Sequence, residues 1–166
     1  EQSKSLNNIS TENKNSLDKI FTKDRKFDII TSQFVIHYLF GNKNSISNLI
    51  KNIDTFLKKD GYVLLTLFDA EAVNKLLDTG TYTSFYTNDD GKREKLYEII
   101  KKYDKISDDV GNAIDVHMSW INDTDKHIEE YLVTKELMTN TMKKAGCRLV
   151  DTDLFSNIYH YNKPYF

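Results

Sequence analysis

The sequence contains few of the residues that mark cross-linked or membrane-embedded chains. Only one of its 166 residues is cysteine, Cys147, so neither an internal disulfide nor a CxxC metal pair can form. Its apolar runs, such as residues 63–65, are far shorter than the roughly 20 residues of a membrane helix, and no charged-then-apolar leader opens the chain. We therefore expect a protein of the cytosol or nucleus that neither crosses a membrane nor is secreted.

An excess of basic residues is also missing. The formal net charge is -2, whereas a protein that coats nucleic acid needs a strongly basic face to displace counterions. Reading a single nucleotide in a pocket is still compatible with this charge. Hydrophobic residues make up 39% and charged residues 29% of the chain, which is typical of one soluble globular domain.

Glycine-rich turns are absent too. No two of the six glycines form the GxG turn that opens a nucleotide-binding α/β domain. If a cofactor binds at a sheet of this chain, its glycine-rich loop must lie outside the chain. Walker loops, serine nucleophile elbows and HExxH helices are likewise missing from the sequence.

The chain divides into a polar start and a globular remainder. Residues 1–25 are rich in Lys and Asn and have too few apolar residues to pack firmly, so we expect a mobile N-terminal segment. The first residue is Glu rather than Met, which suggests a piece of a longer protein. Residues 26–166 contain no repeat and no linker, and we interpret them as one partial domain.

The remainder begins with the pattern of a strand, a helix and a second strand. Residues 26–31 are a short β-branched run typical of a strand buried on both faces, and residues 61–68 form a second such run. Between them, Asn44 or Ser45 can cap a helix that Gly61 ends. Its apolar stripe is Ile46, Leu49, Ile50, Ile53, Phe56 and Leu57. This βαβ unit predicts a parallel sheet covered by helices.

Further elements are expected after this unit. They are a helix at 70–77 capped by Asp69 and closed by Gly80, a turn at 89–91, a half-buried strand at 113–121, a helix capped by Thr134 and ended by Gly146, and a strand at 147–155. In the half-buried strand the inward residues are expected to be Ile114, Val116, Met118 and Trp120. The whole pattern predicts an α/β fold that forms the second half of an open sheet.

The stretch "SQFVIHYLF", residues 32–40, is the first candidate site. Ligands of open α/β sheets bind beyond the carboxyl ends of the strands, and this stretch follows the first strand directly. Gln33, His37 and Tyr38 would then reach the crevice, while residues 34–36 pack beneath it. The alternative is that the two rings simply fill a helix start, as amphipathic rings often do.

The stretch "HIEEYLV", residues 127–133, is the second candidate. Two adjacent glutamates precede an apolar run, so at least one should lie near the interior, where a carboxylate must be paired. The alternative is a solvated acidic pair in a loop. The weaker candidates do not indicate a functional site. The other three histidines, His117, His127 and His160, lack metal-ligand spacing. Cys147 is more typical of a core residue than of a reactive thiol, and the two "DTD" motifs suit loops and caps.

Two separated motifs resemble a known family. The stretches "KFDIITSQFVIHYLF" and "LKKDGYVLLTLFDAEAVNKLL", followed later by "HIEEYLVTKELMTNTMKKAGCRLVDT", resemble mRNA cap guanine-N7 methyltransferases over roughly residues 26–155. The resemblance implies the C-terminal half of a Rossmann-like class I methyltransferase fold. It also implies S-adenosylmethionine as cofactor and capped RNA as substrate.

The resemblance assigns roles to four residues. Gln33 matches the glutamine that contacts S-adenosylmethionine, and Tyr38 matches the tyrosine beside the methionine end of that cofactor and the guanine. His37 matches the histidine that contacts the cap, and Glu130 the glutamate that holds guanine. No residue is assigned as a general acid or base, because N7 already carries a lone pair; His37 and Tyr38 would position the reactants.

The sequence also departs from the family. The glycine-rich first motif, the acidic residue after the second strand and the phosphate-binding basic residues would lie upstream of Glu1, and the doublet Asp60 and Gly61 replaces two glycines. The late aromatic strand that closes the cap pocket in the family is not recognisable in residues 162–166.

Two alternatives to the enzyme stay open. One is a catalytically silent methyltransferase-like subunit that stabilises a capping enzyme, and the other is a methyltransferase for a different base or small molecule. The abundance of Lys and Asn resembles that of a capping enzyme from a large cytoplasmic virus more than that of a cellular enzyme. The expected location is therefore the cytoplasm, in a viral factory or virion, with the nucleus as alternative. The expected partners are the remaining part of the capping enzyme or a stimulatory subunit.

Overall fold

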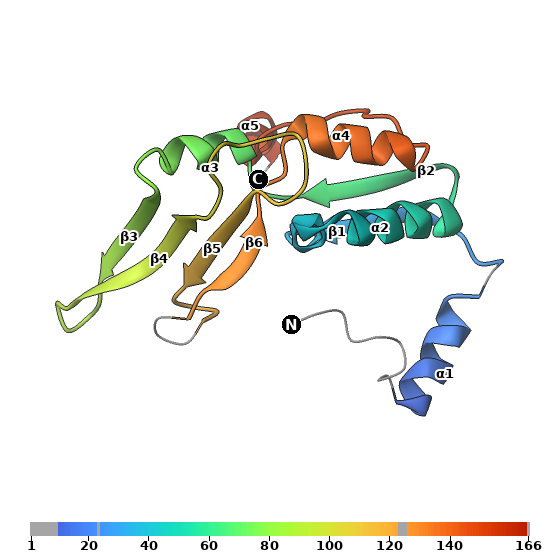
Figure 1. Cartoon of the computed structure of the whole chain (residues 1–166), viewed down its shortest axis with the longest axis horizontal. Helices are drawn as coiled ribbons and strands as arrows, with labels where there is room; N and C mark the ends of the chain where they lie inside the picture. Colours follow the sequence, from blue (N-terminus) through green and yellow to red (C-terminus); the bar gives the residue numbers. More distant parts are fainter. Residues whose placement is uncertain (1–9, 23, 123–125, 166) are drawn as a thin grey trace.

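Two separate sheets organise the chain (Figure 1). The structure is a computed structural model that describes residues 10–22, 24–122 and 126–165. A parallel pair is formed by β1 (Phe27–Gln33) and β2 (Leu57–Thr66), and an antiparallel sheet has the order β3-β4-β5-β6. The latter strands are Thr81–Thr87, Arg93–Lys101, Ala113–Met118 and Ile128–Tyr131. Among the described residues, no helix is long and apolar enough to cross a membrane.

The predicted βαβ unit is confirmed, with corrections to the ends of its helix. α2 (Lys43–Phe56) joins the two parallel strands and buries Ile46 and Ile53. Its N-cap is Asn42, whose side chain accepts from the Ser45 N–H at 3.0 Å, rather than Asn44 or Ser45. The helix ends at Phe56 and not at Gly61, because Leu57 already has extended backbone angles and pairs with Phe27.

Gly61 has a different role from the predicted helix stop. It lies where the pairing register shifts between Phe27 and Ile29, and Asp60 beside it has a positive φ of 62°. A Cβ atom at position 61 would lie 2.8 Å from the Asp28 carbonyl oxygen. The glycine therefore allows a close approach of the two strands.

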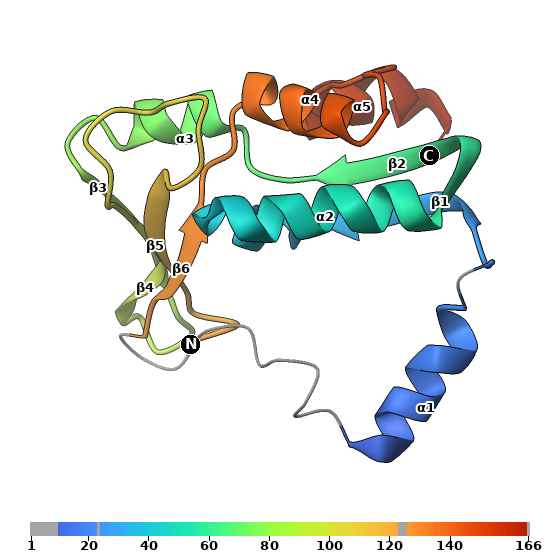
Figure 2. The same cartoon turned by 45° about the vertical axis from the view of Figure 1, so that its right-hand side comes forward.

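The prediction that the first strand is buried on both faces is wrong. Ile29 is 58%, Tyr62 63% and Leu64 58% exposed, and all three lie on the parallel pair. Figure 2 shows α2 running along one face of β1 and β2. A core cluster joins α2 and the later helix α4 (Lys135–Lys144) to the side chains of β2 on that covered face. Because no described element covers the other face, its apolar side chains remain open to solvent.

The antiparallel sheet has a core of its own. α3 (Ala70–Leu76) packs on its inner face and buries Ala70, Val73 and Leu77 against Ile114 and neighbouring strand residues. The predicted cap is confirmed, since Asp69 accepts from the Ala72 N–H at 2.9 Å. The predicted turn at 89–91 joins β3 and β4.

The strand prediction at 113–121 is correct in part. Ile114 and Val116 are buried, but the strand ends at Met118 and Trp120 is 62% exposed. The Asn122 side chain accepts from the Met118 N–H at 2.9 Å, which turns the chain before Trp120 can reach the core. His117, predicted to point to solvent, is only 4% exposed.

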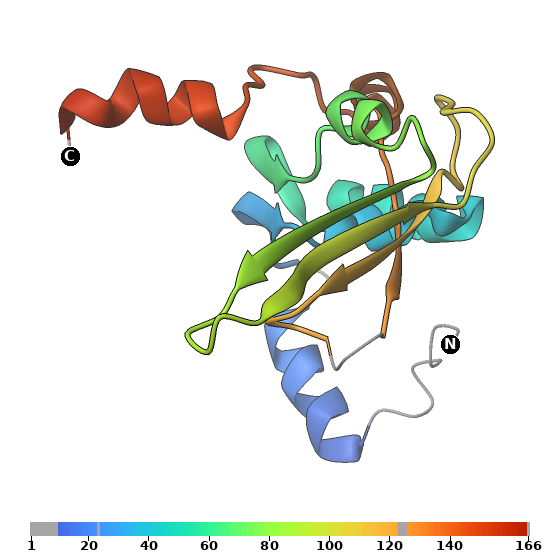
Figure 3. The same cartoon turned by 90° about the vertical axis from the view of Figure 1, so that its left-hand side faces the viewer.

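The last part of the chain contains one correct and one wrong prediction. α4 (Lys135–Lys144) is capped by Thr134, which accepts from the Leu137 N–H at 3.0 Å, and Gly146 follows its end with a φ of 77°. Residues 147–155 form no strand: Val150 is 66% exposed, and no described strand lies beside them. α5 (Phe155–Asn162) and the short η3 (Lys163–Tyr165) follow, and α5 projects beyond the sheets (Figure 3).

The polar N-terminal segment contains a helix that the sequence did not predict. α1 (Thr11–Ile20) begins at Ser10, whose side chain accepts from the Asn13 N–H at 3.3 Å. None of its residues is buried, in keeping with the shortage of apolar side chains. Residues 1–9 of this segment lie outside the described residues, and the mobility of the segment stays a prediction.

Candidate functional site

A sharp turn after β1 presents the first candidate residues. Phe34 has a positive φ of 52°, and its N–H donates to both the carbonyl and the hydroxyl oxygen of Thr66, at 2.9 and 3.1 Å. The chain then enters the short helix η2 (Ile36–Gly41). Ile36 packs inward as predicted, but Phe34 and Val35 are 46% and 58% exposed and do not pack beneath the crevice.

η2 turns its two rings in different directions. His37 is 3% exposed and lies in the interior, whereas Tyr38 is 41% exposed. Their ring centroids are 4.4 Å apart. The neighbouring rings therefore bridge from the protein interior to its surface.

β6 separates the two glutamates of "HIEEYLV". Glu130 is 5% exposed and pairs with the buried Ile114, so it lies on the inner face of the antiparallel sheet. Glu129 pairs with Asp115 on the opposite face and is exposed. The prediction that at least one glutamate lies near the interior is confirmed.

The two candidate stretches meet at the Glu130 carboxylate. The Tyr38 hydroxyl donates to Oε1 at 2.7 Å, and His37 Nε2 lies 3.1 Å from Oε2. His37, Tyr38 and Glu130 therefore lie together, although 92 positions separate Tyr38 from Glu130 in the sequence. What these side chains bind stays a prediction.

Part of the hydrogen-bonding capacity at this junction is unused. His37 Nδ1, His37 Nε2 and Glu130 Oε2 are buried and have no hydrogen-bond partner among the described residues. The 3.1 Å approach of Nε2 to Oε2 has the distance of an ion pair without the direction of a hydrogen bond. Because buried polar atoms are rarely left without partners, this arrangement suits a polar ligand.

Tyr38 is held in its neutral form. Burial, together with its hydrogen bond to Glu130 and the charge of that carboxylate, raises the pKa of Tyr38 to about 12. The phenol is therefore a hydrogen-bond donor at neutral pH, and its acceptor is the carboxylate.

Gln33 is the last residue of β1 and lies at the carboxyl ends of the parallel strands. It pairs with Thr66 in the strand register, and the Thr66 hydroxyl donates to Gln33 Oε1 at 2.8 Å. The amide nitrogen has no partner among the described residues and remains able to donate to a ligand. Sequence reasoning gave Thr66 no role in the site, although the carboxyl ends of adjacent parallel strands are where such a partner would be expected.

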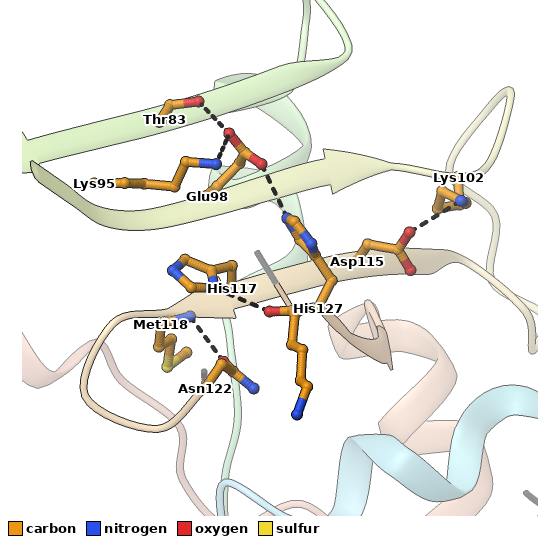
Figure 4. Close-up of polar contacts among 10 residues, drawn as sticks. Thr83, Lys95, Glu98, Lys102, Asp115, His117, Met118, Asn122 and His127 are labelled. Carbon is orange, nitrogen blue, oxygen red and sulfur yellow. Dashed lines mark hydrogen bonds and ion pairs between the residues drawn. The ribbon is translucent and has the colours of Figure 1, made fainter. Parts of the chain in front are cut away.

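Two of the three other histidines, His117 and His127, have structural partners. Figure 4 shows Glu98 accepting from Thr83, Lys95 and His127, and His117 beside His127. His117 Nδ1 lies 2.9 Å from the carbonyl oxygen of Lys126. Within the described ranges, no group of three or more His, Cys, Asp and Glu side chains could hold a metal ion.

Cys147 and the "DTD" motifs fit their predicted structural roles. Cys147 is partly buried against the core that α2 and α4 share, and burial raises the pKa of its thiol. Asp151 and Asp153 each accept from the next backbone N–H, at 2.8 Å, which is loop and cap chemistry. The motif at 123–125 lies outside the described residues.

Comparisons with known proteins identify relatives of this chain. The family model described as "mRNA (guanine-N(7))-methyltransferase domain" matches residues 6–165. A probable mRNA-capping enzyme of Acanthamoeba polyphaga mimivirus is 38% identical over 170 residues. That match covers 99% of this chain but only 14% of the mimivirus protein, so the chain spans a small part of the relative.

A solved structure supports the fold. The S-adenosylmethionine-dependent methyltransferase from Clostridium acetobutylicum ATCC 824 is 18% identical, with a TM-score of 0.50. The match covers 90% of this chain and 66% of that one. The predicted Rossmann-like α/β fold and the resemblance of the sequence motifs are both confirmed.

Proposed function

This chain belongs to the mRNA (guanine-N(7))-methyltransferase domain family, and we propose that its site takes part in methyl transfer from S-adenosylmethionine to N7 of the guanine that caps an mRNA. One observation carries the proposal. The Glu130 carboxylate is buried beside His37 and Tyr38, with an oxygen that has no hydrogen-bond partner among the described residues.

A buried carboxylate is suited to select guanine. The N1–H and the exocyclic amine of guanine are adjacent donors, and the two oxygens of Glu130 can accept from both. Oε2 has no directed partner, whereas Oε1 already accepts from Tyr38. Adenine presents a different edge that lacks this pair of donors, so it would leave a buried carboxylate unsatisfied.

Methyl transfer to N7 demands orientation more than proton transfer. When bound, S-adenosylmethionine supplies a methyl group on a sulfonium sulfur, which N7 accepts with its lone pair as the carbon–sulfur bond breaks. His37 and Tyr38 hold the cap in place beside Glu130, and no proton has to leave N7. The rate gain therefore comes from proximity and orientation.

Gln33 and Tyr38 are the residues that would hold the cofactor. Gln33 has a free amide nitrogen at the carboxyl end of β1, and the Thr66 hydroxyl fixes the orientation of the amide. The partly exposed Tyr38 ring lies beside the buried Glu130 carboxylate. Polar donors at the carboxyl ends of parallel strands fit the general location of such ligands.

The open face of the parallel pair supports a proposal about partners. Ile29, Tyr62 and Leu64 expose more than half of their surface, although parallel sheets are normally covered on both faces. We propose that the remaining part of a capping enzyme, or a stimulatory subunit, covers this face and supplies the glycine-rich loop. Capped RNA would be the substrate, in the cytoplasm of an infected cell or in a virion; a nuclear site is the alternative.

The test compares two neighbouring glutamates in the longest natural polypeptide that contains this chain. Glu130→Gln keeps the shape of the side chain but loses its charge. It should weaken the stabilisation of the bound cap by roughly 1 to 3 kcal/mol, and so lower the rate of methyl transfer to GpppRNA by about 5- to 150-fold. Glu129→Gln is the matched control on the exposed face and should stay within about twofold of the parent. Equal activity of Glu130→Gln and the parent would rule out the proposed reading of guanine.

A further inference from the structure

One buried side chain organises the loop between β4 and β5. Asn112 is 2% exposed, and its Oδ1 accepts from the N–H of Ser107 at 3.0 Å and the hydroxyl of Ser107 at 3.3 Å. Its Nδ2 donates to the carbonyl oxygens of Ser107, Asp109 and Leu132, at 2.9, 3.2 and 3.2 Å. Both ends of the amide are therefore used inside the protein.

The same loop contacts both segments that form the candidate site. The backbone carbonyl of Asn112 accepts from the Leu132 N–H at 2.8 Å, two residues beyond Glu130. The Gly111 N–H donates to the Phe40 carbonyl in η2 at 2.9 Å, and η2 carries His37. Two adjacent residues thus connect segments that lie far apart in the sequence.

The position of Glu130 depends on the register of a very short strand. β6 has four residues, and a shift of one residue would turn Glu130 to the outer face of the sheet. Either register turns one glutamate inward, Glu130 in the observed register and Glu129 after a shift of one residue, so the hydrophobic pattern alone does not select between them. The bonds from Asn112 to both backbone groups of Leu132 oppose such a shift just past the strand end.

We infer that Asn112 is a positioning residue that sets guanine selectivity by fixing the Glu130 carboxylate relative to His37 and Tyr38. The inference rests on the proposed function. The Asn112 amide is buried and bonded within the protein at both ends, so changing it should displace the carboxylate without removing it. The consequence is a loss of two-point recognition, in which one oxygen accepts from N1–H and the other from the exocyclic amine.

The readout is the preference for guanine over hypoxanthine, which lacks the exocyclic amine. Methyl transfer to GpppRNA and to IpppRNA is compared in the longest natural polypeptide that contains this chain. We expect the parent to prefer guanine by about tenfold or more, as for a site that loses a charged hydrogen bond. Asn112→Asp keeps the size of the side chain and its acceptor oxygen, but it loses the N–H groups of Nδ2, one of which donates to the Leu132 carbonyl oxygen. It should reduce the preference for guanine severalfold.

Two controls separate positioning from general loss of stability. Asn122→Asp makes the same chemical change at a partly buried residue whose Oδ1 accepts from the Met118 N–H, and should leave the preference unchanged. Ile53→Val removes a methyl group from the core at α2, and should lower the melting temperature without changing the preference. An equal loss of preference in Ile53→Val at the same melting temperature would overturn the inference.

A milder variant keeps the test decisive if Asn112→Asp does not fold. Ser107→Ala removes only the hydroxyl that donates to Asn112, and should reduce the guanine preference by a smaller factor in the same direction. The inference would be overturned if Asn112→Asp folds and keeps the full parental preference for guanine. If Asn112→Asp does not fold, the same result in Ser107→Ala would overturn it. A parent enzyme that methylates neither RNA would instead contradict the proposed function.

Discussion

Two histidine–glutamate pairs lie on opposite faces of the same antiparallel sheet. His37 and Glu130 meet on the inner face, with Nε2 3.1 Å from Oε2, and His127 and Glu98 meet on the outer face at 2.9 Å. Glu98 accepts from the Thr83 hydroxyl and the Lys95 ammonium as well. Residue type and distance are nearly equal in the two pairs, so neither of them identifies a ligand site.

The pairs differ in how much hydrogen-bonding capacity they leave unused. Burial raises the pKa of Glu98, but hydrogen bonds from Lys95, His127 and Thr83 outweigh it and the pKa is lowered. Glu130 receives a directed hydrogen bond from Tyr38 only, and its other oxygen is buried without one among the described residues. The comparison teaches that unmet capacity in a buried pair, rather than the pair itself, marks a candidate binding site.

The largest expected difference comes from removing each imidazole. His37→Ala should lower methyl transfer to GpppRNA by on the order of a hundredfold, because it removes a positioning group and leaves the buried Glu130 without its neighbour. His127→Ala, the matched change on the outer face, should leave transfer within about twofold. Initial rates of both variants measure the difference, and parental activity in His37→Ala would mean that the two pairs are functionally alike.

A smaller effect on methyl transfer is expected when the Tyr38 hydroxyl that donates to Glu130 is removed. Tyr38→Phe removes the 2.7 Å hydrogen bond and should lower transfer by about 1 kcal/mol, or roughly fivefold. The pH dependence of stability gives a second readout. The pKa of Tyr38 is raised to about 12, so its contribution is complete below pH 10 and is lost as the pH rises from about 10 to 12. Tyr38→Phe should therefore show a shallower alkaline loss of stability.

The matched control for the phenol is Tyr131→Phe. The hydrogen bond to Glu129, together with burial, raises the pKa of Tyr131 to about 12 as well; its acceptor Glu129 lies on the outer face, although the Tyr131 ring itself packs against Gly41 of η2. Alkaline denaturation should become shallower in both variants, whereas methyl transfer should fall only in Tyr38→Phe. A similar fall in Tyr131→Phe would show that transfer responds to the sheet in general and not to the Glu130 cluster.

The smallest effect should follow a change at the outer glutamate. The lowered pKa of Glu98 means that its contribution to stability is present above the ordinary carboxyl range and is lost as the pH falls through the lowered value. Glu98→Gln should lower stability at neutral pH by about 1 kcal/mol and weaken its acid dependence, without changing methyl transfer. Urea melts at neutral and acidic pH measure this; a loss of transfer would give the outer pair a functional role.

Local patterns predicted the elements whose stability is mostly local. The apolar stripe of α2 and the caps at Asp69 and Thr134 could be read directly, because a helix forms its hydrogen bonds within its own segment. The strand predicted at 147–155 failed because a strand needs a neighbour, and no described strand lies beside this apolar run. Ile29 is paired within its sheet, but its exposure also depends on distant parts of the fold, because no described element covers that face of the parallel pair.

The site was predictable only as far as the family motifs reached. The motifs indicated His37, Tyr38 and Glu130, and the structure brings these three side chains together. Asn112 and Thr66 gave no signal, since their importance depends on hydrogen bonds to distant backbone groups and side chains. Such long-range pairings do not follow from residue type or from spacing along the chain.

The most direct test of the central claim is a structure of the longest natural polypeptide that contains this chain, with GpppA bound. We predict that the Glu130 carboxylate accepts from both N1–H and the exocyclic amine of guanine, at about 2.7 to 3.2 Å, with His37 and Tyr38 beside the base. A guanine whose donor edge faces other residues, with the Glu130 carboxylate untouched, would contradict it.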